Sequence, residues 1–273
     1  MRLFPCCAVR LAFALSLSSV VAGTSVAQSL VGNTGPRRPL TVEDATPLPR
    51  QQLEFYLSSI SFTGGDGPSI WSAVPGLAYG LAPRTQVDVR LPLVYPREGG
   101  ERGVAGGELS VIYALNVETQ SLPALALRGG VLAPVGGAST ANGHEWLRGI
   151  VTKRMFGGRG HINYQYTFGD EASVPPAPVD LARWSTGLSF DRLFPVKGIL
   201  VSAEAVARQP IVDSVDPYWT AGAGARYQLT GRTVVEASIS RALDGSNAWS
   251  ASAGLGWSRV VAGLLPGLGR WGR

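Results

Sequence analysis

Residues 218–229, which read YWTAGAGARYQL, show the pattern that most constrains the fold of this chain. Every second residue from Trp219 to Leu229 is apolar, and the residues between them are polar or glycine. A period of two is typical of a β-strand with two different faces and does not fit a helix. Trp219 and Tyr227 lie near the two ends of the apolar face. At about 3.4 Å per residue and a tilt of about 40°, their separation covers about 20 Å, close to the apolar band of an outer-membrane barrel strand.

Eleven further segments repeat this alternation, some of them weakly. The alternation is clear in residues 85–95 and 161–169 and weakest in residues 146–154, where it breaks near Trp146. The set predicts an all-β fold, a closed antiparallel up-and-down transmembrane β-barrel of about twelve strands. The predicted strands are residues 52–63, 70–81, 85–95, 107–116, 124–134, 146–154, 161–169, 183–191, 199–208, 218–229, 234–241 and 249–258.

Residues 1–27 have the pattern of a secretory signal peptide, with a basic start, a short apolar run and small residues up to Ala27. A membrane-anchor helix is the weaker alternative because the apolar run is short. We therefore expect export to the bacterial outer membrane and cleavage after Ala27. Cleavage would remove Cys6 and Cys7, the two cysteines of the chain, and leave no thiol for a disulfide or a metal site.

The predicted barrel occupies residues 51–258. Residues 28–50 are polar, contain four prolines and are expected to form a periplasmic N-terminal arm, while residues 259–273 form a C-terminal tail. Glu43 and Asp44 are adjacent carboxylates in the arm. Adjacent residues of an extended chain point to opposite sides, so these two make a poor acid–base pair, and we expect them to be solvated charges.

The connections between the predicted strands alternate in length. Long polar connections follow odd-numbered strands, and most connections after even-numbered strands are short. Outer-membrane barrels have longer outer loops and short periplasmic turns, so both chain ends are expected on the periplasmic side. Aromatic residues at the starts and far ends of the even-numbered strands predict two girdles. One rim has Trp71, Trp146, Trp184, Trp219 and Trp249, and the other has Tyr79, Tyr113, Phe190, Tyr227 and Trp257.

Charged residues share the predicted inward face, opposite the apolar stripe. A charge on the lipid side would cost about 2–4 kcal/mol at the bilayer midplane, so we expect these side chains to point inward. These inward charges have two interpretations, a polar path for solute or a ladder of ion pairs that fills the lumen. Both can hold in the same barrel. If residues 230–232 form a turn, Arg226 faces Glu236 across the strands. The predicted lumen-lining residues are Asp88, Arg90, Glu108, Arg128, Glu204, Arg208, Arg226 and Glu236.

Several classes of function are disfavoured by what the sequence contains. The net charge of +5, which falls to +3 without the leader, comes with no basic cluster, so we expect no nucleic-acid partner. The two histidines, His144 and His161, belong to no H-E-x-x-H motif, and no G-x-S-x-G motif occurs. We therefore expect no enzyme activity, no catalytic residues, no metal site and no cofactor. A barrel-borne hydrolase remains the fourth alternative, and it would need one of these histidines.

Residues 38–45, which read RPLTVEDA, are followed by Pro49 and the predicted strand at residues 52–57, and residues 219–230 read WTAGAGARYQLT. Both stretches resemble exported "transporter" barrels related to the meta-pathway phenol-degradation protein family. The resemblance would cover residues 36–258. It implies an outer-membrane barrel with a role in small-molecule uptake and supplies no catalytic residues. One difference is that many outer-membrane barrels end on a terminal aromatic residue, whereas this chain continues from Trp257 to Arg273.

These observations predict a narrow channel or transporter for small solutes, aromatic or partly apolar ones included. A barrel of about eight strands is filled by side chains and one of sixteen leaves a channel, so twelve strands fit a narrow path. The expected partners are the lipid bilayer, a small-molecule solute and the barrel-insertion machinery. The second alternative is a closed structural or adhesion barrel with an ion-paired lumen, and the third is an exported soluble β protein.

Overall fold

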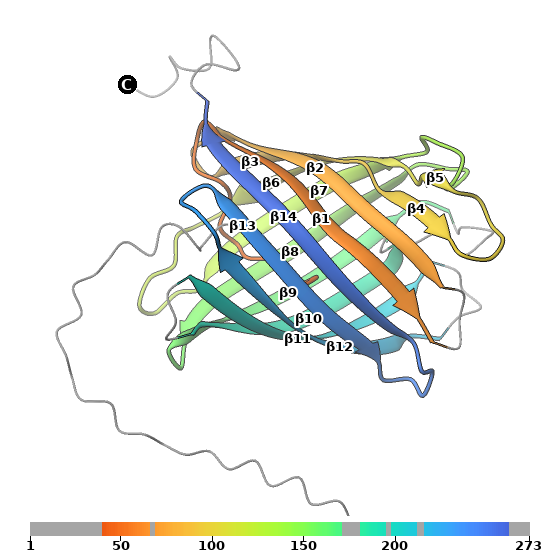
Figure 1. The fold of residues 1–273 in the computed structure, drawn as a ribbon. Helices are drawn as coiled ribbons and strands as arrows, with labels where there is room; N and C mark the ends of the chain where they lie inside the picture. The colour runs from red at the N-terminus through yellow and green to blue at the C-terminus, as the bar shows by residue number, and fades with distance from the viewer. Residues whose placement is uncertain (1–39, 66–68, 171–180, 195–197, 212–215, 262–273) are drawn as a thin grey trace, which may run out of the picture. The chain divides into compact units, whose positions relative to one another are not determined.

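The computed structural model describes residues 40–65, 69–170, 181–194, 198–211 and 216–261. The secondary-structure elements of these residues are β-strands (Figure 1). The predicted signal peptide, the arm up to residue 39 and the tail from residue 262 lie outside the described residues. No helix in the described part is long and apolar enough to span a membrane. The strands are β1 (Gln52–Gly64), β2 (Ile70–Ala82), β3 (Thr85–Arg90), β4 (Leu93–Pro96), β5 (Gly103–Val104), β6 (Gly107–Ala114), β7 (Ala124–Ala133), β8 (His144–Met155), β9 (Gly158–Phe168), β10 (Ala182–Leu193), β11 (Ile199–Pro210), β12 (Tyr218–Gln228), β13 (Thr233–Ala242) and β14 (Trp249–Val260).

The strands close into an antiparallel barrel because β1 pairs with both β2 and β14 (Figure 1). β3 and β4 both pair with β2 and are two parts of one barrel strand, interrupted at Leu91 and Pro92. β5 and β6 are likewise two parts of the next strand, because β5 pairs with β4 and β6 with β3. The described residues therefore form a closed barrel of twelve strands, as the sequence predicted. Gln52 pairs with Val260, so the first strand begins at the end of the barrel where the last strand finishes.

Most strands have an apolar outer face and a polar inner face, the opposite of a soluble β protein. In β9, Ile162 and Tyr164 are about half exposed on the outside, whereas Asn163 and Gln165 are buried inside. The same alternation places Val89 outside, with 49% of its surface exposed. An apolar outer surface over a polar interior is the arrangement of a transmembrane barrel, in which lipid contacts the outer face.

A β-bulge in β1 shifts the strand's outward face. The pairing of β1 with β14 slips between Leu57 and Ile60, so the outward positions pass from Leu57 to Ile60. This shift brings Phe62 against Trp71 and Trp249, with ring centroids 5.0 and 5.5 Å apart. The predicted alternation of residues 52–63 did not include the bulge.

The predicted tryptophan rim is correct at three exposed positions and wrong at one. Trp71, Trp219 and Trp249 are 50%, 51% and 39% exposed, whereas Trp146 is 7% exposed and belongs to the inward face of β8. The inward residues of β8 include Trp146 and Ile150, so both faces of this strand carry apolar side chains. That is why the alternation of residues 146–154 was weak. At the other rim, Tyr113, Tyr227 and Trp257 are exposed.

Candidate functional site

The described part of the N-terminal arm lies against the inward face of the barrel. Its backbone N–H groups donate hydrogen bonds to side chains of three strands, which replace the water that would otherwise satisfy these donors. The donor and acceptor pairs are Val42 to Glu204 Oε2 (2.9 Å), Ala45 to Thr152 Oγ1 (3.0 Å) and Leu48 to Gln86 Oε1 (2.6 Å).

Apolar side chains of the arm add to this attachment. Val42, Ala45 and Leu48 are at most 2% exposed. Ala45 joins a buried cluster with residues that include Ile112 and Ile150, and Leu48 joins a second cluster with Tyr56 and Ala78. Because the lumen buries these side chains as a protein core would, the arm is an integral part of the barrel's interior.

The expectation that Glu43 and Asp44 are solvated is wrong. Asp44 is fully buried, and its Oδ2 lies 2.8 Å from Nη1 of Arg159. Glu43 bridges two guanidinium groups, with Oε2 2.9 Å from Nη1 of Arg128 and Oε1 2.5 Å from Nη1 of Arg148. The two carboxylates do point apart, as expected for adjacent residues, but the barrel wall surrounds the arm, so each of them meets an arginine.

The two arginines that hold Glu43 come from neighbouring strands. Arg128 of β7 and Arg148 of β8 are direct cross-strand partners. Arg128 also donates to Ser110 Oγ at 2.9 Å and lies 3.4 Å from Asp88, while Arg148 donates to Gln165 Oε1 at 2.9 Å. These contacts orient both guanidinium groups toward the Glu43 carboxylate.

Charge and burial act in opposite directions on Glu43, which lies in the arm and not in a barrel strand. Burial would raise the pKa of its carboxyl group, but the charges of Arg128, Arg148 and Arg90 outweigh burial and lower the pKa to about 2. Glu43 is therefore ionised at neutral pH and forms charge-assisted hydrogen bonds with the two guanidinium groups.

Trp146 completes this group of side chains. Its ring centroid lies 5.8 Å from the guanidinium carbon of Arg128 and 5.5 Å from that of Arg148, within cation–π range. The ring packs over Gly130, where a Cβ atom would come within 2.6 Å of it. The sequence analysis missed Glu43, Arg148, Trp146 and Gln165 as site residues. For Trp146, Arg148 and Gln165 the available signal was their odd or even position along residues 146–154 and 161–169, whereas no strand pattern covers Glu43.

A luminal cavity of about 560 Å³ reaches this group of side chains. The arm contributes residues 40–43 to its lining, together with Trp146, Arg148 and Gln165. Seven of the eight residues predicted to line the lumen border this cavity, and the eighth, Arg226, is buried away from it. The seven are Asp88, Arg90, Glu108, Arg128, Glu204, Arg208 and Glu236.

The register predicted for the turn after β12 is confirmed. Arg226 pairs with Glu236, and the N–H group of Leu229 donates to the carbonyl oxygen of Thr233 at 3.0 Å. Arg90 and Glu108, two of the residues predicted to line the lumen, also face each other across neighbouring strands and form an ion pair, with 2.6 Å between Nη2 and Oε1. Both an ion-pair ladder and a polar cavity are therefore present in the described lumen.

A buried cluster below the arm contains a hydroxyl, a histidine and a carboxylate. Thr152 Oγ1 lies 2.9 Å from Nδ1 of His161, and Nε2 of His161 lies 3.5 Å from Asp191 Oδ2. Thr152 also accepts the hydrogen bond of Ala45 N–H, and all three side chains are at most 2% exposed. None of the three lines the luminal cavity, and the Thr152 side chain is buried.

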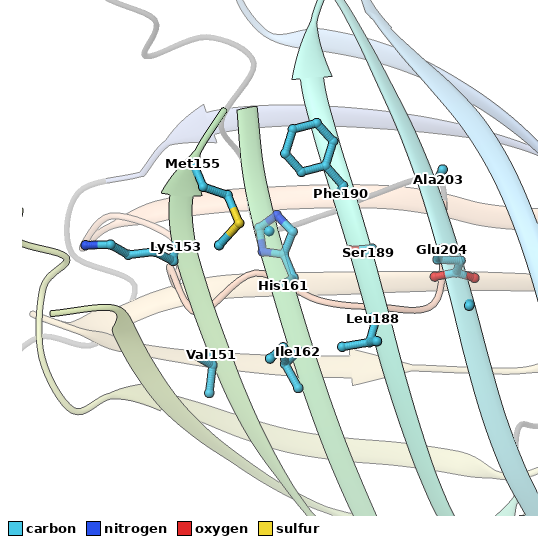
Figure 2. Close-up of a pocket in the computed structure, with 12 residues that line it drawn as sticks. Val151, Lys153, Met155, His161, Ile162, Leu188, Ser189, Phe190, Ala203 and Glu204 are labelled. Carbon is cyan, nitrogen blue, oxygen red and sulfur yellow. The ribbon is translucent and has the colours of Figure 1, made fainter. Parts of the chain in front are cut away.

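A separate hollow of about 470 Å³ lies on the outer wall of the barrel. Figure 2 shows Val151, Ile162 and Leu188 on neighbouring strands, and Ile162 and Leu188 are exposed outward residues. Lys153 lies beside the hollow, but its amino group already donates to the carbonyl oxygen of Thr119 at 2.7 Å. The lining is mostly apolar and belongs to the exposed outer face of the barrel. The described residues contain no group of three or more His, Cys, Asp or Glu side chains placed to hold a metal ion.

No protein-family model and no curated protein matches this sequence. Solved structures do match the fold. The COG4313 outer membrane channel from Pseudomonas putida F1 has a TM-score of 0.53 at 12% identity, covering 79% of this chain and 98% of that chain. A KdgM porin in complex with disordered oligogalacturonate has a TM-score of 0.50 at 9% identity, covering 76% of this chain and 98% of that one. The chain therefore has the fold of outer-membrane channel barrels.

Proposed function

We propose that this protein is a bacterial outer-membrane channel for small solutes, narrowed by its own N-terminal arm. The observation that carries the proposal is the polar luminal cavity of about 560 Å³, which is bordered on one side by arm residues 40–43. The exposed apolar outer face supports a location in a lipid bilayer. A secretory signal in residues 1–27 and assembly by the barrel-insertion machinery belong to the same proposal.

The solutes we propose are small and include aromatic or partly apolar molecules. The resemblance of residues 38–45 and 219–230 to barrels related to the meta-pathway phenol-degradation family supports this choice, as does Trp146 on the cavity lining. A channel of this kind would pass solutes slowly and select them by size, because the arm crosses the polar lumen. It would not show the conductance of a wide porin.

Reconstitution in liposomes tests the proposal. Arabinose and phenyl glucoside are suitable solutes, because they differ in aromatic content and cross a bare bilayer slowly. The mature protein should admit both slowly, and deletion of residues 28–45 should raise both rates because the deletion removes the ion-paired part of the arm. If neither form exceeds empty liposomes, the channel proposal is wrong.

The second candidate function is a closed structural or adhesion barrel. The ion pairs of Arg90 with Glu108 and of Asp44 with Arg159 favour it, because they fill part of the lumen with paired charges. The same liposome experiment separates the two functions. A barrel that stays impermeable after deletion of residues 28–45 would be closed by its own wall, which is what the structural function requires.

A further inference from the structure

The Glu43 carboxylate is held the way a bound ligand is held. Its two oxygens each contact a different guanidinium group, 2.9 Å from Arg128 and 2.5 Å from Arg148, and 17% of the Glu43 side chain remains exposed. Both arginines belong to the barrel wall, and Glu43 belongs to a segment that is not part of any strand. Two convergent arginines form a site for one carboxylate, and the arm supplies that carboxylate.

The barrel wall needs an anion at this place. Arg128 and Arg148 are directly opposed on β7 and β8, and like charges at directly opposed positions destabilise a strand pair. Arg128 has Asp88 at 3.4 Å, and Arg90 has Glu108 at 2.6 Å. Arg148 contacts Gln165 on the wall, and this side chain is neutral. Within the described residues, the acidic side chain that pairs with Arg148 is Glu43. Without the arm, the wall therefore carries a positive charge that one carboxylate would balance.

The same site also offers an aromatic surface and access from the cavity. The Trp146 ring lies within 5.8 Å of both guanidinium carbons and borders the cavity together with Glu43, Arg128 and Arg148. The cavity lining continues to Tyr218 and Trp249, which begin β12 and β14 at the end of the barrel opposite the chain ends. The lining therefore extends from Glu43 and Trp146 toward that end of the barrel, from which a solute would approach them. A volume of about 560 Å³ is within the range of small-ligand sites.

We propose that Arg128, Arg148 and Trp146 form a binding site for small aromatic carboxylates, and that Glu43 occupies this site as a tethered competitor. The inference rests on the proposed channel function and names its substrate class. A solute carboxylate replaces the Glu43 carboxylate between the two guanidinium groups, and its ring packs against Trp146. Because Glu43 is tethered, its effective concentration at the site is about millimolar, so a solute must reach comparable levels to displace it.

Calorimetry of the detergent-solubilised mature protein with benzoate tests the binding site, with benzamide as a neutral probe of the same shape. In Glu43→Gln and in the chain that lacks residues 28–45, benzoate should bind about tenfold more tightly than to the unaltered protein, because the competing carboxylate is gone. Benzamide affinity should change little. Adding Arg148→Gln to Glu43→Gln should abolish the preference for benzoate. Arg241→Gln, which removes an exposed charge that contacts Asn247, is the matched control and should not alter this preference.

Four outcomes decide between the possibilities. Equal gains for benzoate and benzamide, or a preference for benzoate that survives loss of Arg148, would overturn the carboxylate site and leave the arm as a steric obstruction. If Glu43→Gln does not fold, the same comparison of benzoate with benzamide is made on the variant that lacks residues 28–45. Benzoate binding without any solute passage in liposomes would retain the site and refute the channel. Passage of arabinose and phenyl glucoside without benzoate binding would retain the channel and refute the site.

Discussion

At the scale of single residues, the side of the Trp146 ring that faces Gly130 is closely packed. The Trp146 ring occupies the space above Gly130, where a Cβ atom would lie 2.6 Å from the ring and 2.8 Å from the Ser110 Cβ atom. Glycine is therefore needed at this position for the room it leaves, and a side chain of any size would displace the ring. The position of the Trp146 ring in turn determines the aromatic surface that both Arg128 and Arg148 contact.

Gly130→Ala should consequently destabilise the barrel by about 1–3 kcal/mol through overpacking. Gly149→Ala is the matched control in the adjacent strand, because a Cβ atom there has no neighbour within 4 Å. The free energy of unfolding in urea, measured on the protein refolded into lipid vesicles, gives the comparison. Equal losses in the two variants would show that the Trp146 ring does not rest on Gly130.

The ionisation of Glu43 gives the arm a defined pH dependence. Its pKa is lowered from the ordinary 4.5 to about 2, so the interaction with the two arginines is fully present above pH 4.5 and is lost as the pH falls toward 2. A spin label on a cysteine at position 40 should therefore stay immobile between pH 8 and pH 5 and become mobile only as the pH falls from 4.5 toward about 2. Glu43→Gln should remove this transition. A label that becomes mobile between pH 7 and pH 5 would contradict the assignment.

At the scale of the element, the arm is attached by contacts to many strands. Polar and ionic partners for its residues come from β3, β7, β8, β9 and β11. Where the arm joins β1, the N–H group of Gln51 donates to the carbonyl oxygen of Gly80 at 2.7 Å. The Pro49 carbonyl oxygen lies 1.9 Å from the position a Cβ atom of residue 80 would take. Gly80 thus allows the arm backbone to approach β2 closely.

Gly80→Ala should force the end of the arm away from β2 and loosen the arm as a whole. We expect Gly80→Ala to have a higher conductance in planar bilayers than the unaltered protein, as we expect for the variant that lacks residues 28–45. Gly107→Ala is the control, because the nearest atom to the new Cβ would be a methyl carbon of Val135 at 3.9 Å. Unchanged conductance in Gly80→Ala, with a correctly folded barrel, would mean that the arm tolerates displacement at this point.

At the scale of the whole molecule, the barrel turns its apolar residues outward and its charged residues inward. Val89 and Arg90 show this in one strand, because Val89 is 49% exposed on the outer face and Arg90 borders the luminal cavity. Lipid on the outside makes this distribution favourable, since a charge facing lipid would cost about 2–4 kcal/mol at the midplane.

Single cysteines at positions 89 and 90, in a chain without Cys6 and Cys7, test this orientation. Each cysteine carries a fluorescent label, and the barrel is placed in vesicles with a lipid-soluble quencher. The label at position 89 should be strongly quenched and the label at position 90 only weakly. Equal quenching would contradict the orientation and support the exported soluble β protein.

The strands and the closed barrel of twelve strands were predictable from the sequence, because the two faces of a strand follow directly from backbone geometry. Alternation places Val89 and Arg90 on opposite faces whatever the rest of the chain does. The pairing of Arg226 with Glu236 was predictable for a related reason, since a short turn sets the register of the two strands that it joins. Trp146 was assigned to the wrong face because both faces of β8 carry apolar residues.

Only the tertiary structure showed that the arm enters the lumen and that Glu43 and Asp44 are buried. The luminal acceptors of the arm's hydrogen bonds lie 38 to 162 residues away from it in the sequence, so no local pattern indicates them. Arg128 and Arg148 meet at one place because closure of the barrel brings β7 and β8 against the arm. Local alternation determined the wall of this protein, and long-range closure determined which side chains meet in its interior.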